Sequence, residues 1–297
     1  MVEIYYHIRA WLEGTYTLRI LENFCDLLLK IGPYLLISIG ISVATTRLLR
    51  GKQFLFSSRN EILSVLSAAG IGLVSPLPTY AAIPIALSLM PTGVPYSAVI
   101  AFVISSPLMN PSVFFLTATE LGMEMAIART ATAFILGTAG GLLVMTIFRS
   151  LSRASTRTPE APQRPERTVL MDAWKTFRYT AKYFSIAMLL SAAVKALVPP
   201  QAVADLLGSH ATTGTLLAIG LGVPFYSCGG AAIPFMETLM GLGMSKGATL
   251  AFCIAGPATK LETLYAFKAL LGGRVLLFYL GLTFAFACLV GMLYSFF

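Results

Sequence analysis

The hydrophobic positions of this chain form long runs, without the short alternating patterns of a soluble domain. Long, largely apolar stretches cover residues 20–49, with a possible kink at Gly32-Pro33, and residues 126–148, 172–197 and 275–296. Each is close to or longer than the ~20 residues that a helix needs to cross a bilayer. Shorter stretches, broken by proline or glycine, cover residues 61–75, 81–90, 96–120, 214–240 and 247–270. The pattern predicts an all-α, polytopic membrane protein of about eight to ten helical segments, some of them broken or re-entrant.

The interrupted region occurs twice. Residues 70–110 align without a gap with residues 220–260, at an offset of 150. A bias toward apolar residues would match leucines and alanines, but it would not match these glycines and prolines. We therefore infer an internal duplication. The matched pairs include Gly70/Gly220, Gly72/Gly222, Pro84/Pro234, Gly93/Gly243 and Pro107/Pro257.

The duplication and the composition divide the chain into four parts. Residues 1–19 hold several aromatic side chains and predict an interfacial segment. Residues 20–148 form the first membrane repeat and residues 171–297 the second. Residues 149–170, rich in arginine and proline, predict a polar linker between them.

Loop charges indicate how the two repeats are oriented. The 47–60 loop carries four basic residues, whereas its counterpart at 199–212, also expected as a loop, carries none. We interpret Glu120, Glu124, Lys268 and Arg274 as loop charges. By the positive-inside rule the linker and the 268–274 turn are cytoplasmic and both termini lie outside. The sequence thus predicts two inverted-topology repeats in a bacterial-type inner membrane.

Composition changes the picture in two respects. Of the 297 residues, 57% are hydrophobic and 11% charged, against about 25% charged in globular chains, so the lipid bilayer is the expected partner. The net charge of +8 lies in connections between apolar stretches and does not predict nucleic-acid binding. Scattered cysteines, two histidines and no nucleotide-binding motif predict neither metal nor cofactor. Active transport would then be coupled to an ion such as a proton, or driven by a partner; the oligomeric state is not indicated.

The candidate site is formed by the duplicated breaks. Broken helices in repeat transporters place backbone groups against the substrate near the midplane. The alternative is that the breaks are kinks that help helices pack. The substrate-binding candidates are Pro78, Thr79, Tyr80, Ser105, Ser106, Asn110, Tyr226, Ser227, Cys228, Gly229, Gly230, Pro257, Thr259 and Lys260.

Cys228 is the candidate with the most specific chemistry. It lies at the break of the second repeat, next to two glycines that permit close backbone approach. Its thiol could offer a soft ligand to a thiophilic solute, or it could be a small buried packing residue. Cys25, Cys253 and Cys288 lie in ordinary apolar runs and are interpreted as packing residues.

Ionisable residues within apolar segments form a second group of candidates, because a charge in the bilayer normally has a partner or a pore. Lys260 follows the break that we expect at Pro257 and could pair with Glu237 or Glu262. Such a pair could be structural, a proton-coupled switch or an anion contact. Arg129, a few residues into the 126–148 stretch, completes the coupling or ion-pair candidates.

These residues also carry a family resemblance over nearly the whole chain. Tyr226-Ser-Cys-Gly-Gly and Gly256-Pro-Ala-Thr-Lys260, with Ser105-Ser-Pro-Leu-Met-Asn-Pro111 in the first copy, resemble the predicted permease family that includes the bacterial trivalent organoarsenical efflux permeases. The resemblance implies an integral membrane permease and a role for cysteine in arsenical recognition. Only Cys228 lies in a motif.

We therefore predict a permease, not an enzyme, that exports a small thiophilic or metalloid solute, such as an organoarsenical, by alternating access. Two alternatives stay open. One is an intramembrane enzyme or lipid-carrier protein that acts on a headgroup, and the other is a passive channel.

Overall fold

The computed structural model describes residues 19–30, 60–75, 94–147, 188–208, 211–225 and 232–295, together with scattered single helical positions at 33–40 and 178–186. Every regular element in these ranges is helical, which confirms the all-α prediction. The linker at 149–170 and residues 1–18 of the predicted interfacial segment lie outside the described residues.

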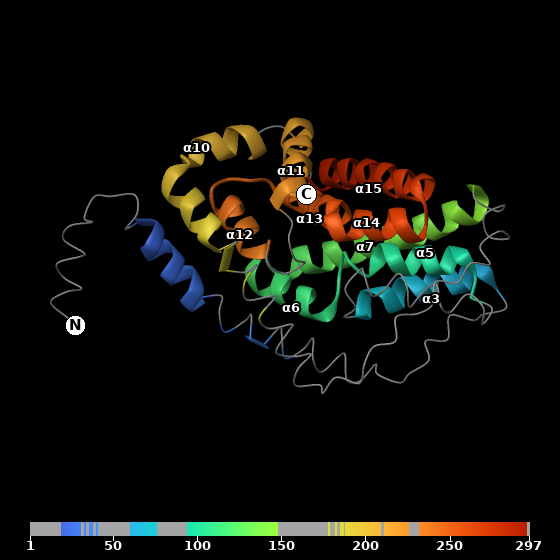
Figure 1. Cartoon of the computed structure of the whole chain (residues 1–297). Helices are drawn as coiled ribbons and strands as arrows, with labels where there is room; N and C mark the ends of the chain where they lie inside the picture. The colour runs from blue at the N-terminus through green and yellow to red at the C-terminus, as the bar shows by residue number, and fades with distance from the viewer. Residues whose placement is uncertain are drawn as a thin grey trace.

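The first repeat contains four labelled helices, preceded by the helical residues 19–30 (Figure 1). Asn60 begins the first of them as its N-cap, because its side-chain oxygen accepts a hydrogen bond from Ile62 N at 3.1 Å. Asn110 begins the third in the same way. The four helices are α3 (Glu61–Val74), α5 (Tyr96–Ser105), α6 (Pro111–Glu120) and α7 (Met123–Ile147).

The second repeat contains the corresponding helices and a short helical segment that precedes them. This segment consists of α10 (Pro200–Val203) and a π-helix (Ala204–Gly208), so the 199–212 segment that we expected as a loop is largely helical. Pro199 and Pro200 begin α10, where a missing N–H costs nothing. The remaining helices are α11 (Ala211–Phe225), α12 (Ile233–Gly241), α13 (Lys246–Thr259), α14 (Leu261–Leu270) and α15 (Gly273–Tyr294).

The helix boundaries repeat at the offset seen in the sequence. α3 and α11, α5 and α13, α6 and α14, and α7 and α15 begin 150 residues apart. The packing repeats as well, since α5 lies between α3 and α7 as α13 lies between α11 and α15. Even the turns agree, because Gly122 and Gly272 precede the last helix of each repeat with φ of +93° and +90°. The duplication is therefore a duplication of structure.

Glycine allows the helices of each repeat to pack closely. A Cβ placed on Gly141 of α7 would lie only 2.8 Å from the carbonyl oxygen of Ser97 in α5. Its counterpart Gly291 of α15 would place a Cβ 3.0 Å from the carbonyl oxygen of Gly247 in α13. Small residues at such contacts let helix backbones approach, which is how helices associate within a bilayer.

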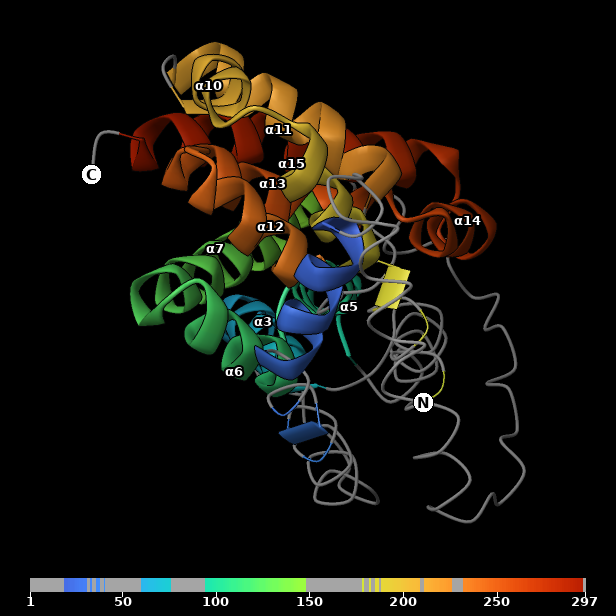
Figure 2. The same cartoon turned by 90° about the vertical axis from the view of Figure 1, so that its left-hand side faces the viewer.

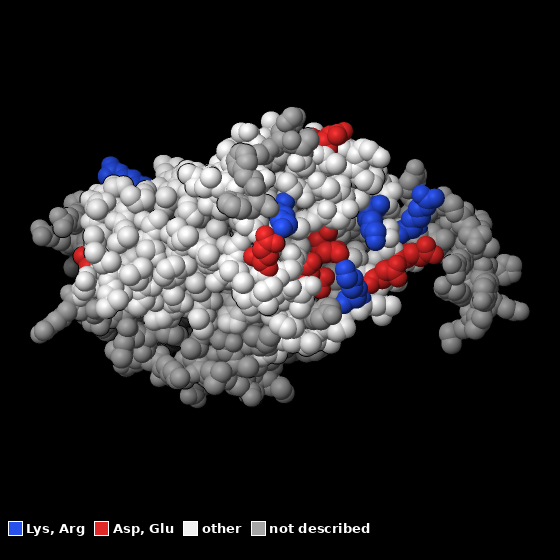
Figure 3. Space-filling model, turned by 180° about the vertical axis from the view of Figure 1, so that it is seen from behind, with Lys and Arg blue, Asp and Glu red and all other residues white. Residues whose placement is uncertain are grey.

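The described helices have the length and outer surface of membrane spans. α7 and α15 are long and apolar enough to cross a membrane, and residues 188–197 with 200–208 make a third span, bent by 110°, if counted together. Large apolar side chains point outward from α7 and α15. Seen from behind, charged side chains gather toward one end and leave much of the surface uncharged (Figure 3). These features confirm a helical membrane protein.

The two repeats meet along their last helices. Tyr294, at the end of α15, donates a hydrogen bond to Glu124, at the start of α7. Farther along, a Cβ on Gly140 of α7 would lie 3.3 Å from Leu282 of α15. The helices therefore run side by side in opposite directions (Figure 1). Below, the end of the molecule at which α7 begins is called the Glu124 end.

The glycine contact yields a stability prediction. Gly291→Val should lower the thermal midpoint of the detergent-solubilised protein, since overpacking of a filled contact costs about 1–3 kcal/mol. Gly281→Val on the same helix is the matched control, because a Cβ there meets nothing within 4 Å. Equal midpoints for the two variants, measured by thermal aggregation and size-exclusion chromatography, would contradict close packing at Gly291.

Candidate functional site

The structure describes six of the fourteen predicted substrate-binding residues. Ser105, Ser106, Asn110, Pro257, Thr259 and Lys260 lie in described parts of the chain. For Glu262, placed in α14, only the backbone is described. The other eight, which stay predictions, lie outside the described residues: Pro78, Thr79, Tyr80, Tyr226, Ser227, Cys228, Gly229 and Gly230.

The break of the first repeat lies between α5 and α6. Ser105 ends α5 and Ser106 follows it, both buried. The side chain of Asn110 then accepts a hydrogen bond from Val113 N at 2.9 Å, and Pro111 takes the first position of α6. This arrangement satisfies one of the orphan N–H groups of the new helix. The break predicted within residues 96–120 from Pro107 and Pro111 is confirmed.

The break of the second repeat lies three residues later than predicted. We expected it at Pro257, but α13 continues through this proline to Thr259. The chain leaves the helix at Lys260, whose backbone (φ −57°, ψ 128°) is not helical, and α14 starts at Leu261. Lys260 thus occupies the place of Asn110, but its side chain makes no capping hydrogen bond.

The two breaks lie at about the same depth in the molecule. α13 runs alongside α7 in the same direction, because Lys246 at its start contacts Glu124 at the start of α7 and Cys253, farther along α13, lies within electrostatic reach of Arg129, farther along α7. Lys260 therefore falls near the level of Gly137, about thirteen residues into α7. Ser105 packs against that glycine, where a Cβ would lie 2.9 Å from its own Cβ. Polar groups from both repeats thus lie at one depth of the helix bundle.

Glu237 has a partner that the sequence analysis did not consider. Lys30, from the helical residues 19–30, donates a hydrogen bond to its carboxylate at 2.8 Å. Figure 2 shows that helix beside α12, which also packs on α6. The prediction that Glu237 pairs with Lys260 is thus replaced by a pair in which Lys30 comes from the first repeat.

Glu120 belongs to the same group and is not the loop charge that we expected. It is the last residue of α6, and both its carboxylate oxygens are buried with no hydrogen bond in the described part of the chain. Lys30 and Glu237 both act on it electrostatically. The Lys30 ammonium group therefore acts on two carboxylates, Glu120 of the first repeat and Glu237 of the second.

Arg129 is fully buried, as a functional or structural charge inside a bilayer must be. Its Nη1 donates a hydrogen bond to Thr117 Oγ1 at 3.2 Å, linking α7 to α6. The equivalent residues of the second repeat are Tyr279 and Phe267, whose rings stack with centroids 4.2 Å apart. The same buried position thus holds a charge in one repeat and an aromatic ring in the other.

Lys30, Glu120 and Thr117 are residues that sequence reasoning missed. Thr117 and Glu120 lie three residues apart on α6, which places them on one face of that helix. That spacing was a signal that could have been used. Lys30 gave no signal, because it meets its partner 207 residues away.

These observations define a class of protein: a multi-pass helical membrane protein with paired helix breaks and buried charges, as in permeases. A family model described as "Predicted permease" matches residues 17–296. The chain belongs to this predicted permease family, which confirms the resemblance and indicates a transporter.

Two relatives of the chain carry family names only. Over 257 residues it is 23% identical to the UPF0718 protein YcgR of Bacillus subtilis, a match that covers 83% of this chain and 87% of that protein. Over 106 residues it is 31% identical to the UPF0718 protein MJ0584 of Methanocaldococcus jannaschii, which covers 36% of this chain but only 29% of that protein. No solved structure matches the chain.

The break of the first repeat gives a second stability prediction. Asn110→Ala removes the oxygen that caps α6 and should reduce the free energy of unfolding by about 1 kcal/mol. Asn110→Asp keeps an acceptor and should stay close to the original stability. Denaturant titration of the detergent-solubilised protein measures both. An alanine variant as stable as the aspartate variant would contradict the capping role.

Proposed function

We propose that this protein is a secondary permease that exports a small thiophilic or metalloid solute, of the organoarsenical type, by alternating access. One observation carries the proposal: the same helix boundaries recur in two halves whose last helices run in opposite directions. Two halves related in this way can open a shared central site to either side by rocking against each other.

The inverted orientation is supported by charge together with geometry. The basic linker follows the end of α7, and Arg274 and Lys268 lie beside the start of α15. Because α7 and α15 run in opposite directions, these basic groups fall at the same end of the molecule. The positive-inside rule makes that end cytoplasmic, in a bacterial-type inner membrane. The Glu124 end then faces outward, and so do both termini.

The solute would bind where the helices break. Ser105, Ser106 and Thr259 offer hydroxyl groups at the level of the breaks, and Lys260 offers a positive charge. Helix ends there leave carbonyl and N–H groups that a solute could satisfy. Cys228 follows the end of α11, whose counterpart α3 ends beside the first break. In this proposal its thiol supplies the soft ligand.

Export against a gradient needs an energy source, and Glu120 is the group that we propose to carry the coupling proton. Its carboxylate oxygens are buried, and it lies within electrostatic reach of the Lys30–Glu237 pair, which joins the two halves. Movement of one half would change which carboxylate Lys30 neutralises. Protonation would then be linked to the orientation of the site.

The thiol assignment is tested by one substitution. Cys228→Ser should abolish export of a trivalent organoarsenical, because a hydroxyl is a poor ligand for a soft centre. Uptake into everted membrane vesicles measures it, and Cys288→Ser on α15 is the matched control. If Cys228→Ser exports at the original rate, the thiol is not part of the site.

The same vesicles test the class of function. A panel of arsenicals, metal ions and small anions would identify the solute. Accumulation above the external concentration would support the permease. Movement that only equalises the concentrations would instead indicate a passive channel.

The proton assignment is tested separately. In proteoliposomes, Glu120→Gln should lose accumulation driven by a pH gradient but keep exchange of solute at equal concentrations, because exchange needs no net proton movement. Glu61→Gln, a carboxylate on α3 that bonds Ser97 within one half, is the control. Retained pH-driven accumulation in the glutamine variant would remove Glu120 from the coupling step.

A further inference from the structure

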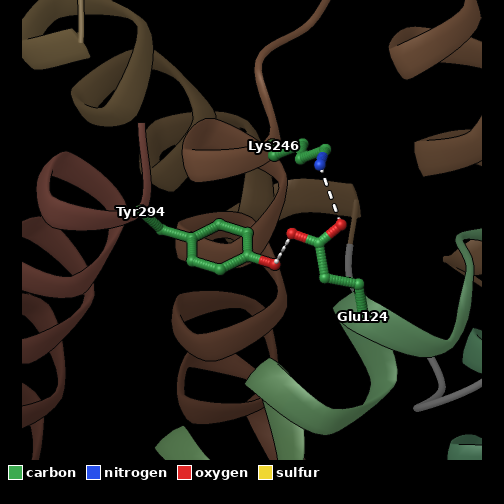
Figure 4. Close-up of polar contacts among 3 residues, drawn as sticks. All are labelled: Glu124, Lys246 and Tyr294. Atoms are coloured by element: carbon green, nitrogen blue, oxygen red, sulfur yellow. Dashed lines mark hydrogen bonds and ion pairs between the residues drawn. The ribbon is translucent and has the colours of Figure 1, made fainter. Parts of the chain in front are cut away.

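We propose that Glu124 holds the two halves together at the Glu124 end and so closes an outer gate. This inference rests on the proposed alternating-access function and adds the contact that closes one side. It is carried by a three-residue group, Glu124, Lys246 and Tyr294, which we call the latch (Figure 4).

Both oxygens of Glu124 are used, and both bonds cross between the halves. Oε2 accepts a hydrogen bond from Lys246 Nζ at 2.9 Å, and Oε1 accepts one from the Tyr294 hydroxyl at 3.0 Å. Figure 4 shows the carboxylate between the two partners. A single side chain on α7 thus bonds both to the start of α13 and to the end of α15. These are the helices that would have to separate if this end opened.

Lys246 lies where helix stability alone would not place it. It is the first residue of α13, at the positive end of that helix dipole, where a cation is unfavourable. Glu124, in the first turn of α7, is favourable for the same reason. The glutamate lies between two helix N-termini and an ammonium group. The lysine is therefore better explained by its partner than by its own helix.

The positions equivalent to the latch in the other repeat do not carry the same residues. By the offset of 150, the residues equivalent to Glu124, Lys246 and Tyr294 are Arg274, Tyr96 and Val144. An arginine with a tyrosine and a valine cannot make the same ionic contact. Near the latch, Lys30 and Glu237 form a second ion pair between the halves. The duplication has thus diverged so that closure of the outer side is reinforced, while the equivalent position of the cytoplasmic side lacks this contact.

Cys253 is a native reporter for this gate. It lies two turns along α13 from Lys246, is 2% exposed, and is within electrostatic reach of Arg129 on α7. Separation of α13 from α7 at the Glu124 end would therefore expose its thiol. A full-length background of Cys25→Ser, Cys228→Ser and Cys288→Ser leaves Cys253 as the one thiol.

The test measures the rate at which a polar maleimide labels Cys253 in nanodiscs, where both faces are accessible. Glu124→Gln should raise the rate about two- to fivefold, the factor that an exposed ion pair supports. Glu124→Lys, which places two cations together, should raise it further. The exchange Glu124→Lys with Lys246→Glu should restore protection, because it rebuilds the ion pair with reversed sign.

Glu61→Gln is the matched control, because that carboxylate bonds Ser97 inside one half. It should leave the labelling rate unchanged. Each variant is first shown to be folded by size-exclusion chromatography. If Glu124→Gln and Glu124→Lys label Cys253 no faster than the control, or if the exchanged pair gives no protection, the latch is overturned.

Labelling needs no solute, so the latch and the proposed function can fail independently. Transport is measured in the protein that keeps all four cysteines. Faster labelling in the Glu124 variants, with no transport of any tested solute by that protein, would support the latch and count against the permease assignment. Normal transport with unchanged labelling would support the permease and overturn the latch.

Discussion

Close contact between helix backbones is the constraint on which this structure depends. In a bilayer no water is available to satisfy polar backbone groups, and helices gain little by burying apolar surface against one another. Gly141 and Gly291 meet the constraint by removing the side chain where α7 crosses α5 and α15 crosses α13. Because the same contact is made in both halves, α3, α5 and α7 pack closely in the first half as α11, α13 and α15 do in the second.

The arrangement of polar groups at the helix breaks depends on this packing. Where α5 and α13 end inside the molecule, their backbone groups must be satisfied by a cap, a neighbour or a solute. Asn110 supplies a cap in the first half, and Lys260 stands without one in the second. The halves share a backbone plan but differ in chemistry. The two breaks therefore share a place in the fold but end their helices with different residues.

The sequence predicted the helices well because their signals are local. The run of 126–148 became α7, and Pro111 marked the start of α6. The break of the second repeat exists but falls at Lys260, three residues after Pro257, because packing of neighbouring helices in a membrane can compensate for a proline within a helix. The ion pairs could not be predicted: Lys30 and Glu237 are 207 residues apart and meet only through the fold. The predicted residues around Cys228 lie outside the described residues.

The unequal pair at Arg129 and Tyr279 has an electrical consequence. A unit charge that crosses the whole membrane potential changes energy by about 2.3 kcal/mol per 100 mV, and Arg129 has such a charge where Tyr279 has none. If the first half is displaced relative to the bilayer, Arg129 therefore moves charge through part of the field, whereas Tyr279 at the equivalent position of the second half moves none. In the proposed permease, the resting voltage of a cell would thus act on the first half through Arg129 even before any solute is bound.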